Sequence, residues 1–108
     1  MKPLIIVVVI ILTFANCREK IHQNHPEFIG FWKGNDKLKS YTIRITDDGE
    51  GRYAYVGDND MRNYEGKARY KNGELIIGLK RLTVNQMPYN SEGKQKMEVD
   101  GIVYQLFD

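Results

Sequence analysis

Few side chains in this chain of 108 residues could do covalent or acid-base chemistry. The sequence has one cysteine, Cys17, and two histidines, His22 and His25, and all three precede the region with strand-like patterning. A nucleophile needs a neighbouring base, and neither Ser40 nor Ser91 has an obvious one. A zinc site needs three or four fixed ligands, more than the two histidines supply. We therefore predict a protein that is not an enzyme and that uses no cofactor and no metal.

Acidic residues gather in two short segments, Asp47-Asp48-Gly49-Glu50 and Asp58-Asn59-Asp60. A calcium site takes about six to eight oxygen ligands, and neither segment has the spacing of an EF-hand loop. Asp, Asn and Gly are also the residues that form tight turns. We interpret both segments as turns between strands. A pair of catalytic carboxylates that converge from these turns, as in a hydrolase, is the alternative.

The N-terminus has the features of an export signal. A basic start, Met1-Lys2-Pro3, precedes an apolar run over residues 4–14, and Ala15-Asn16 stand before Cys17. A helix needs about 20 apolar residues to cross a bilayer, so this run is too short for a permanent span. Its length suits the hydrophobic region of a cleaved signal peptide.

The cysteine at the end of this leader resembles that of a bacterial lipoprotein signal. The resemblance implies cleavage before Cys17 and attachment of a diacylglyceryl group, with fatty acyl chains such as palmitate, to its thiol. The chain would then comprise a signal peptide (residues 1–16), a lipidated cysteine with a polar tether (residues 17–27) and a folded domain (residues 28–108). The mature protein would be anchored to a membrane of the bacterial cell envelope, on the periplasmic or the surface side. Ordinary secretion with a free Cys17, or an uncleaved anchor, are the alternatives.

The mature chain of 92 residues is long enough for one domain. The formal charge is only +2, and cations alternate with anions along the sequence, so we expect no nucleic-acid partner. From Phe28 onward apolar residues recur at every second position, as in Tyr41, Ile43 and Ile45, which is typical of strands with one buried face. No later segment has a helical period, apart from a possible turn near residues 26–29.

Two dipeptides predict hairpins. Asn72-Gly73 suits a type I′ turn and would place Lys71 opposite Glu74. The same register sets three further pairs: Tyr70 with Leu75, Ala68 with Ile77, and Glu65 with Lys80. Asp100-Gly101 would likewise place Val99 opposite Ile102 and Met97 opposite Tyr104. Between these hairpins, residues 82–87 would form a strand that ends at Pro88 and the loop over residues 89–93. Seven or eight such strands predict an all-β domain, a small antiparallel meander β-barrel, with a β-sandwich as the alternative.

Gly30-Phe31-Trp32 opens the first predicted strand and resembles the start of the first strand in lipocalins and related calycins. The resemblance implies a barrel whose floor is closed by the tryptophan and whose interior binds a small apolar ligand. The residues that would line or floor this cavity are Trp32, Tyr41, Tyr53, Tyr55, Tyr70 and Tyr104.

A second hypothesis is a lipoprotein that binds or inhibits an envelope protein through exposed loops. Residues 87–93, with Tyr89, and residues 57–62, with Arg62, would form this contact. A cavity behind Trp32 would favour the small ligand, and a filled interior with a protruding Tyr89 loop would favour the protein partner.

Overall fold

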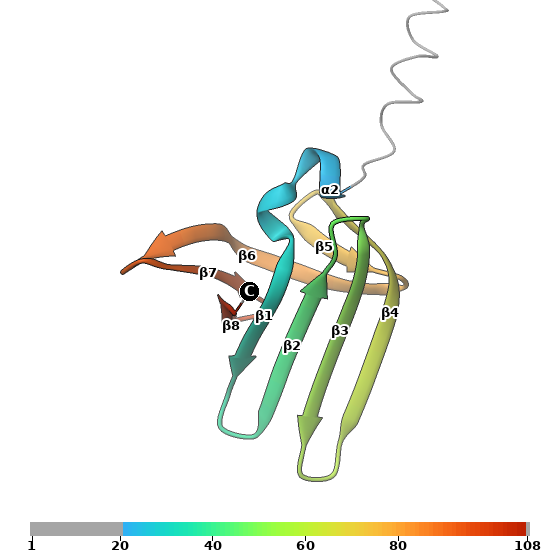
Figure 1. Ribbon diagram of the computed structural model, residues 1–108. Helices are drawn as coiled ribbons and strands as arrows, with labels where there is room; N and C mark the ends of the chain where they lie inside the picture. Colours follow the sequence, from blue (N-terminus) through green and yellow to red (C-terminus); the bar gives the residue numbers. More distant parts are fainter. Residues whose placement is uncertain (1–20, 108) are drawn as a thin grey trace, which may run out of the picture.

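The computed structural model describes residues 21–107, and they form a closed antiparallel barrel of eight strands (Figure 1). Each strand pairs with the next in the chain, and β8 pairs with β1 to close the barrel. The predicted meander barrel is thereby confirmed. The strands are β1 (Gly30–Asn35), β2 (Lys39–Ile45), β3 (Glu50–Gly57), β4 (Met61–Lys71), β5 (Glu74–Ile77), β6 (Lys80–Ser91), β7 (Lys94–Val99) and β8 (Ile102–Leu106).

Both predicted hairpins have the turns that their sequences favour. Asn72 and Gly73 have positive φ angles of 53° and 77°, and Asp100 and Gly101 have 49° and 77°, as a type I′ turn requires. The pairs Lys71 with Glu74, Tyr70 with Leu75 and Ala68 with Ile77 are present, and so are Val99 with Ile102 and Met97 with Tyr104. The turn chemistry therefore sets the register over most of both hairpins.

The predicted pairing of Glu65 with Lys80 is wrong. Strand β5 ends at Ile77, and the chain turns back through residues 78–79, so that Lys80 lies opposite Ile77. Glu65 instead lies opposite Arg52 in β3, and the two side chains form an ion pair. Near this point the backbone of β4 and the turn that follows β5 approach each other closely. A Cβ atom on Gly66 would lie 2.5 Å from the Cα of Gly78.

The predicted loop after Pro88 is also wrong. Strand β6 continues through Pro88 to Ser91, and Tyr89 lies within it, opposite Lys96. There are two register shifts in this strand pair, one between Val84 and Gln86 and one between Gln86 and Tyr89, and the second spans the proline. A bulge tolerates proline because the ladder lacks a regular hydrogen bond there. The turn of this hairpin is Glu92-Gly93, again with two positive φ angles.

The segment before β1 is folded, although it was expected to be a tether. Helix α2 (Ile21–Asn24) and the 3₁₀ turn η1 (Pro26–Phe28) bury Ile21 and Phe28 completely in the barrel core. They lie at the end of the barrel opposite the β1–β2 and β3–β4 turns (Figure 1). His22 and His25 are therefore part of the folded domain. The expectations for the leader and for Cys17 fall outside the described residues.

The core follows the alternation of the strands. Trp32, Ile43, Ile45, Leu75, Ile77, Leu82, Met97 and Val99 are fully or almost fully buried. The indole Nε1 of Trp32 donates a hydrogen bond of 2.9 Å to the Phe28 carbonyl oxygen, so burial leaves this polar group satisfied. The first strand is thus joined to the segment that covers one end of the barrel.

Candidate functional site

Four of the tyrosines predicted to bind a ligand lie together on the inner face of the sheet. The ring centroids of Tyr41 and Tyr55 are 5.9 Å apart, those of Tyr53 and Tyr55 6.0 Å, and those of Tyr41 and Tyr104 6.4 Å. Tyr53 and Tyr104 are buried, whereas Tyr41 and Tyr55 are half-buried. These separations are typical of packed aromatic pairs. The row therefore combines two core residues with two residues at the rim.

Tyr64 completes this row, although it was not among the residues predicted to bind a ligand. Its ring stacks on that of Tyr53 with centroids 5.9 Å apart. Tyr64 lies directly opposite Tyr53 in the β3–β4 hairpin. Counting strand positions outward from a two-residue turn at Asp58-Asn59 places the two residues opposite each other. This expected register is the sequence signal that could have identified Tyr64 as a neighbour of Tyr53.

The other two predicted ligand residues lie elsewhere. Trp32 is fully buried within the hydrophobic core. Tyr70 packs against the N-terminal segment, with its ring 5.3 Å from that of Phe28 and 4.8 Å from that of His25. These two residues therefore support the fold and are not part of the tyrosine row.

Burial fixes the ionisation of the inner tyrosines. Loss of solvent raises the pKa of Tyr53 from 10.0 to about 12 and raises the pKa of Tyr104 still further. Both phenols are therefore neutral at physiological pH. They can pack and donate hydrogen bonds, but they supply no phenolate for catalysis.

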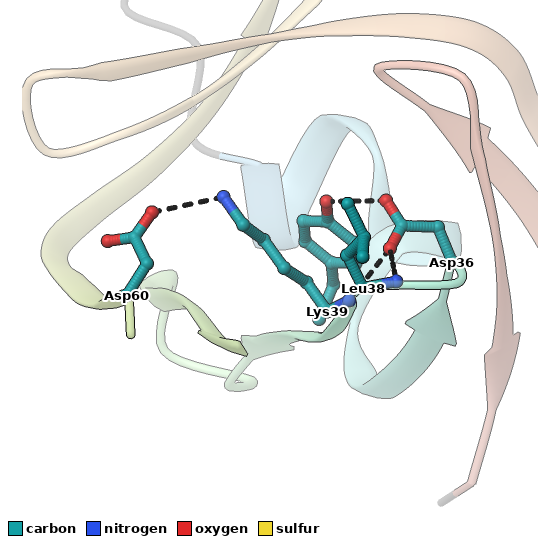
Figure 2. A network of polar contacts seen from close by, with 5 residues as sticks. Asp36, Leu38, Lys39 and Asp60 are labelled. Atoms are coloured by element: carbon teal, nitrogen blue, oxygen red, sulfur yellow. Dashed lines mark hydrogen bonds and ion pairs between the residues drawn. The ribbon is translucent and has the colours of Figure 1, made fainter. Parts of the chain in front are cut away.

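At the rim, Asp36 organises the β1–β2 turn (Figure 2). Its carboxylate accepts hydrogen bonds of 2.8 Å from the backbone N–H groups of Leu38 and Lys39, and one of 2.9 Å from the Tyr41 hydroxyl. These bonds lower the pKa of Asp36, the backbone bond from Leu38 most of all. The turn is therefore held in one conformation and joined to the tyrosine row.

Lys39 links this turn to the neighbouring hairpin (Figure 2). Its Nζ atom lies 3.0 Å from a carboxylate oxygen of Asp60 in the β3–β4 turn and 4.5 Å from the centroid of the Tyr55 ring. The hydrogen bond to Asp60 is the largest cause that raises the pKa of Lys39. The β1–β2 and β3–β4 turns are therefore in contact with each other at the rim of the barrel.

Large apolar side chains are exposed at these same turns. Leu38 is 76% exposed and Met61 is 72% exposed, and Val56, opposite Met61, is 51% exposed. Arg62, one of the two predicted partner residues, is exposed at the same hairpin end, but it lies opposite Tyr55 and so points to the other face of the sheet from Val56 and Met61. Tyr89, the other one, lies in β6 and is only partly exposed. We call Leu38, Val56 and Met61 the hairpin-end surface.

A second feature is a groove of about 560 Å³ on the outer face of the sheet, where β1, β2, β7 and β8 meet. Its lining includes Lys33, Lys96, Asn35, Thr42, Gln105 and Phe107. Tyr41 also lines this groove, and it is the one lining residue that was predicted to be functional. No local pattern in the sequence brings β1 and β7 together, because β8 separates them.

Among residues 21–107, no group of three or more His, Cys, Asp or Glu side chains is arranged to hold a metal ion. The described helices include none that is long and apolar enough to cross a membrane. Comparison with family models, curated proteins and solved structures finds no match to this chain.

Proposed function

We propose that this protein acts by binding, and that its principal partner is another protein of the bacterial cell envelope, held at the hairpin-end surface. The exported chain is anchored to the membrane by acyl groups on Cys17, as its leader sequence suggests. Two or more acyl chains would hold a protein on a membrane surface firmly. The protein is not an enzyme in this proposal.

The observation that carries the proposal is that large apolar side chains are exposed on turns whose conformation is fixed by polar contacts. Leu38 and Met61 are among the most exposed large apolar residues, yet they stand on turns tied together by Asp36 and by the Lys39–Asp60 ion pair. A turn whose backbone is already fixed loses little backbone conformational entropy when its side chains enter a partner's pocket. Arg62, on the other face of the same hairpin end, is of a residue type that is enriched in interface hot spots.

Site-specific photo-crosslinking tests this proposal. A photoreactive amino acid is placed at position 38, 61 or 79 of the full-length protein in its native cells. Leu79 is the matched control, because it is fully exposed but lies in the turn between β5 and β6. We expect one discrete crosslinked protein from positions 38 and 61 and none from position 79. Equal crosslinking from all three positions, or none from 38 and 61, would refute the proposal.

The second candidate is the binding of a small apolar ligand at the tyrosine row. It is supported by the half-buried rings of Tyr41, Tyr55 and Tyr64, which offer aromatic surface at the rim. Titration with the fluorescent probe 1-aminoanthracene tests it. Binding that is weakened at least tenfold by Tyr55→Ala, and not by Tyr70→Ala, would support a ligand site in the row. Equal effects of the two variants would argue against it.

A further inference from the structure

A continuous row of side chains crosses five strands on the outer face of the sheet, and all but its last member line the groove. Thr42 lies opposite Lys33, Lys33 opposite Gln105, Gln105 opposite Lys96, and Lys96 opposite Tyr89. Directly opposite residues in an antiparallel sheet point to the same face. The row therefore presents a hydroxyl, a cation, an amide, a second cation and a phenol, in that order.

The spacing of the two cations follows from the sheet. Neighbouring strands are about 4.8 Å apart, so Lys33 in β1 and Lys96 in β7 start about 10 Å apart, with Gln105 between them. Neither lysine forms an ion pair with any residue between 21 and 107. No acidic side chain is found among the described residues that line the groove. The groove therefore offers an anion two positive charges that no acidic side chain of residues 21–107 compensates.

The remaining lining is suited to hydroxyl groups and to the faces of sugar rings. Asn35, Thr42 and Gln105 provide amide and hydroxyl groups that both donate and accept hydrogen bonds. Phe107 is 56% exposed at one end of the groove, and the Nζ atom of Lys33 lies 4.7 Å from the centroid of its ring. An exposed ring beside a cation gives a flat apolar surface next to a positive charge.

We propose that this groove binds an acidic saccharide, a chain of sugar rings that carry carboxylates. The carboxylates pair with Lys33 and Lys96, the hydroxyl groups meet Thr42 and Gln105, and ring faces lie against Phe107 and Tyr89. A purely apolar ligand would leave the two ammonium groups without counter-charge. This site lies on the outer face and is separate from the hairpin-end surface.

Isothermal titration calorimetry of the full-length protein in detergent tests the proposal. The probe is a hyaluronan tetrasaccharide, which alternates glucuronate with N-acetylglucosamine. The uncharged chitin tetrasaccharide and inorganic sulfate are the comparison ligands. We expect the acidic saccharide to bind at least tenfold more tightly than either comparison ligand, and its affinity to fall as salt is added.

Variants locate the site. Lys33→Gln and Lys96→Gln should each weaken saccharide binding about tenfold, whereas Lys71→Gln, an exposed cation at the β4–β5 turn, should leave it within twofold. The double variant Leu38→Ser/Met61→Ser should not change it, which separates this proposal from the protein-binding function. Far-ultraviolet circular dichroism confirms that each variant is folded. Three results would each overturn the proposal. The first is equal affinity for the acidic saccharide and for the uncharged saccharide or sulfate, and the second is an equal loss of affinity in Lys71→Gln and Lys33→Gln. The third is no binding at millimolar concentrations of the acidic saccharide.

Discussion

The inner tyrosines are the residues whose state is set most strongly by the fold. Tyr53 and Tyr104 place their rings in the core, and burial raises the pKa of both phenols above the ordinary value of 10.0. Because the folded protein holds these protons more tightly than the unfolded chain, their contribution to stability is complete below about pH 10. It is lost as the pH rises through the folded-state pKa, which for Tyr53 is about 12.

This linkage predicts the alkaline behaviour of the protein. The free energy of unfolding should fall progressively above pH 10, and some of the seven tyrosines should ionise only near pH 12 or above. Absorbance at 295 nm during alkaline titration measures this ionisation. In denaturant, all seven tyrosines should titrate together near pH 10. A native titration that matches the denatured one would contradict the described burial of Tyr53 and Tyr104.

Asp36 gives a second prediction at the scale of single residues. Asp36→Ala removes the acceptor for the Leu38 and Lys39 amides, so we expect at least tenfold faster hydrogen exchange at these two amides. Asp58→Ala, in the neighbouring turn, is the matched control and should leave their exchange unchanged. Unchanged exchange in the Asp36 variant would show that the carboxylate does not hold the turn.

Individual residues were predictable where the alternation of a strand decides their position. The two-residue period placed Tyr53 and Tyr104 on the buried face, and the structure agrees. It could not separate Tyr70 from the row, because the contact of Tyr70 with Phe28 depends on where the N-terminal segment folds. The burial of Ile21 escaped prediction for the same reason, since a short helix after a polar stretch shows no period.

Strand β4 shows how one glycine determines the path of an element. Its first half pairs with β3 and its second half with β5, and the change of partner occurs near Gly66. A side chain at Gly66 would overlap the backbone of Gly78, and neither backbone segment has a flexible end that could move away. The backbone crossing therefore requires glycine at this position.

Gly66→Ala should accordingly destabilise the barrel by more than about 2 kcal/mol, through overlap and a strained φ angle. Gly73→Ala is the control, because its φ is also positive but no atom lies within 4 Å of the added Cβ. Gly73→Ala should lower the free energy of unfolding by only about 1 to 2 kcal/mol. Urea denaturation of both variants measures the difference. Equal losses would mean that the close approach to Gly78 has no energetic role.

Strand pairing was predictable where a local turn determined the register. The prediction was wrong where a contact between residues distant in the sequence intervened. Asn72-Gly73 and Asp100-Gly101 were sufficient to predict two hairpins. Extending the first register to Glu65 failed, because β5 is short and Lys80 already belongs to the next strand. Pro88 was interpreted as the end of a strand, whereas β6 continues through a register shift that spans the proline. The outer groove depends on closure of β8 against β1, which no local signal encodes.

On the scale of the whole molecule, the proposal combines a membrane anchor with a barrel that presents its binding groups on turns and on its outer face. The anchoring part makes a direct prediction. Cells fed an alkyne-labelled palmitate should incorporate it into the wild-type protein and not into Cys17→Ser. The variant should also be released from the membrane fraction. Equal labelling of both proteins, or a wild-type N-terminus upstream of Cys17, would contradict lipid anchoring.

The central claim is that the hairpin-end surface is covered by a partner in the cell, and cysteine accessibility tests it most directly. Leu38→Cys, Met61→Cys and Leu79→Cys are each prepared with the native leader, and the rate of reaction with a small maleimide is compared between intact cells and purified protein. We predict that positions 38 and 61 react at least tenfold more slowly in cells than in the purified protein, whereas position 79 reacts at the same rate in both. Equal rates at positions 38 and 61 in cells and in the purified protein would contradict the claim.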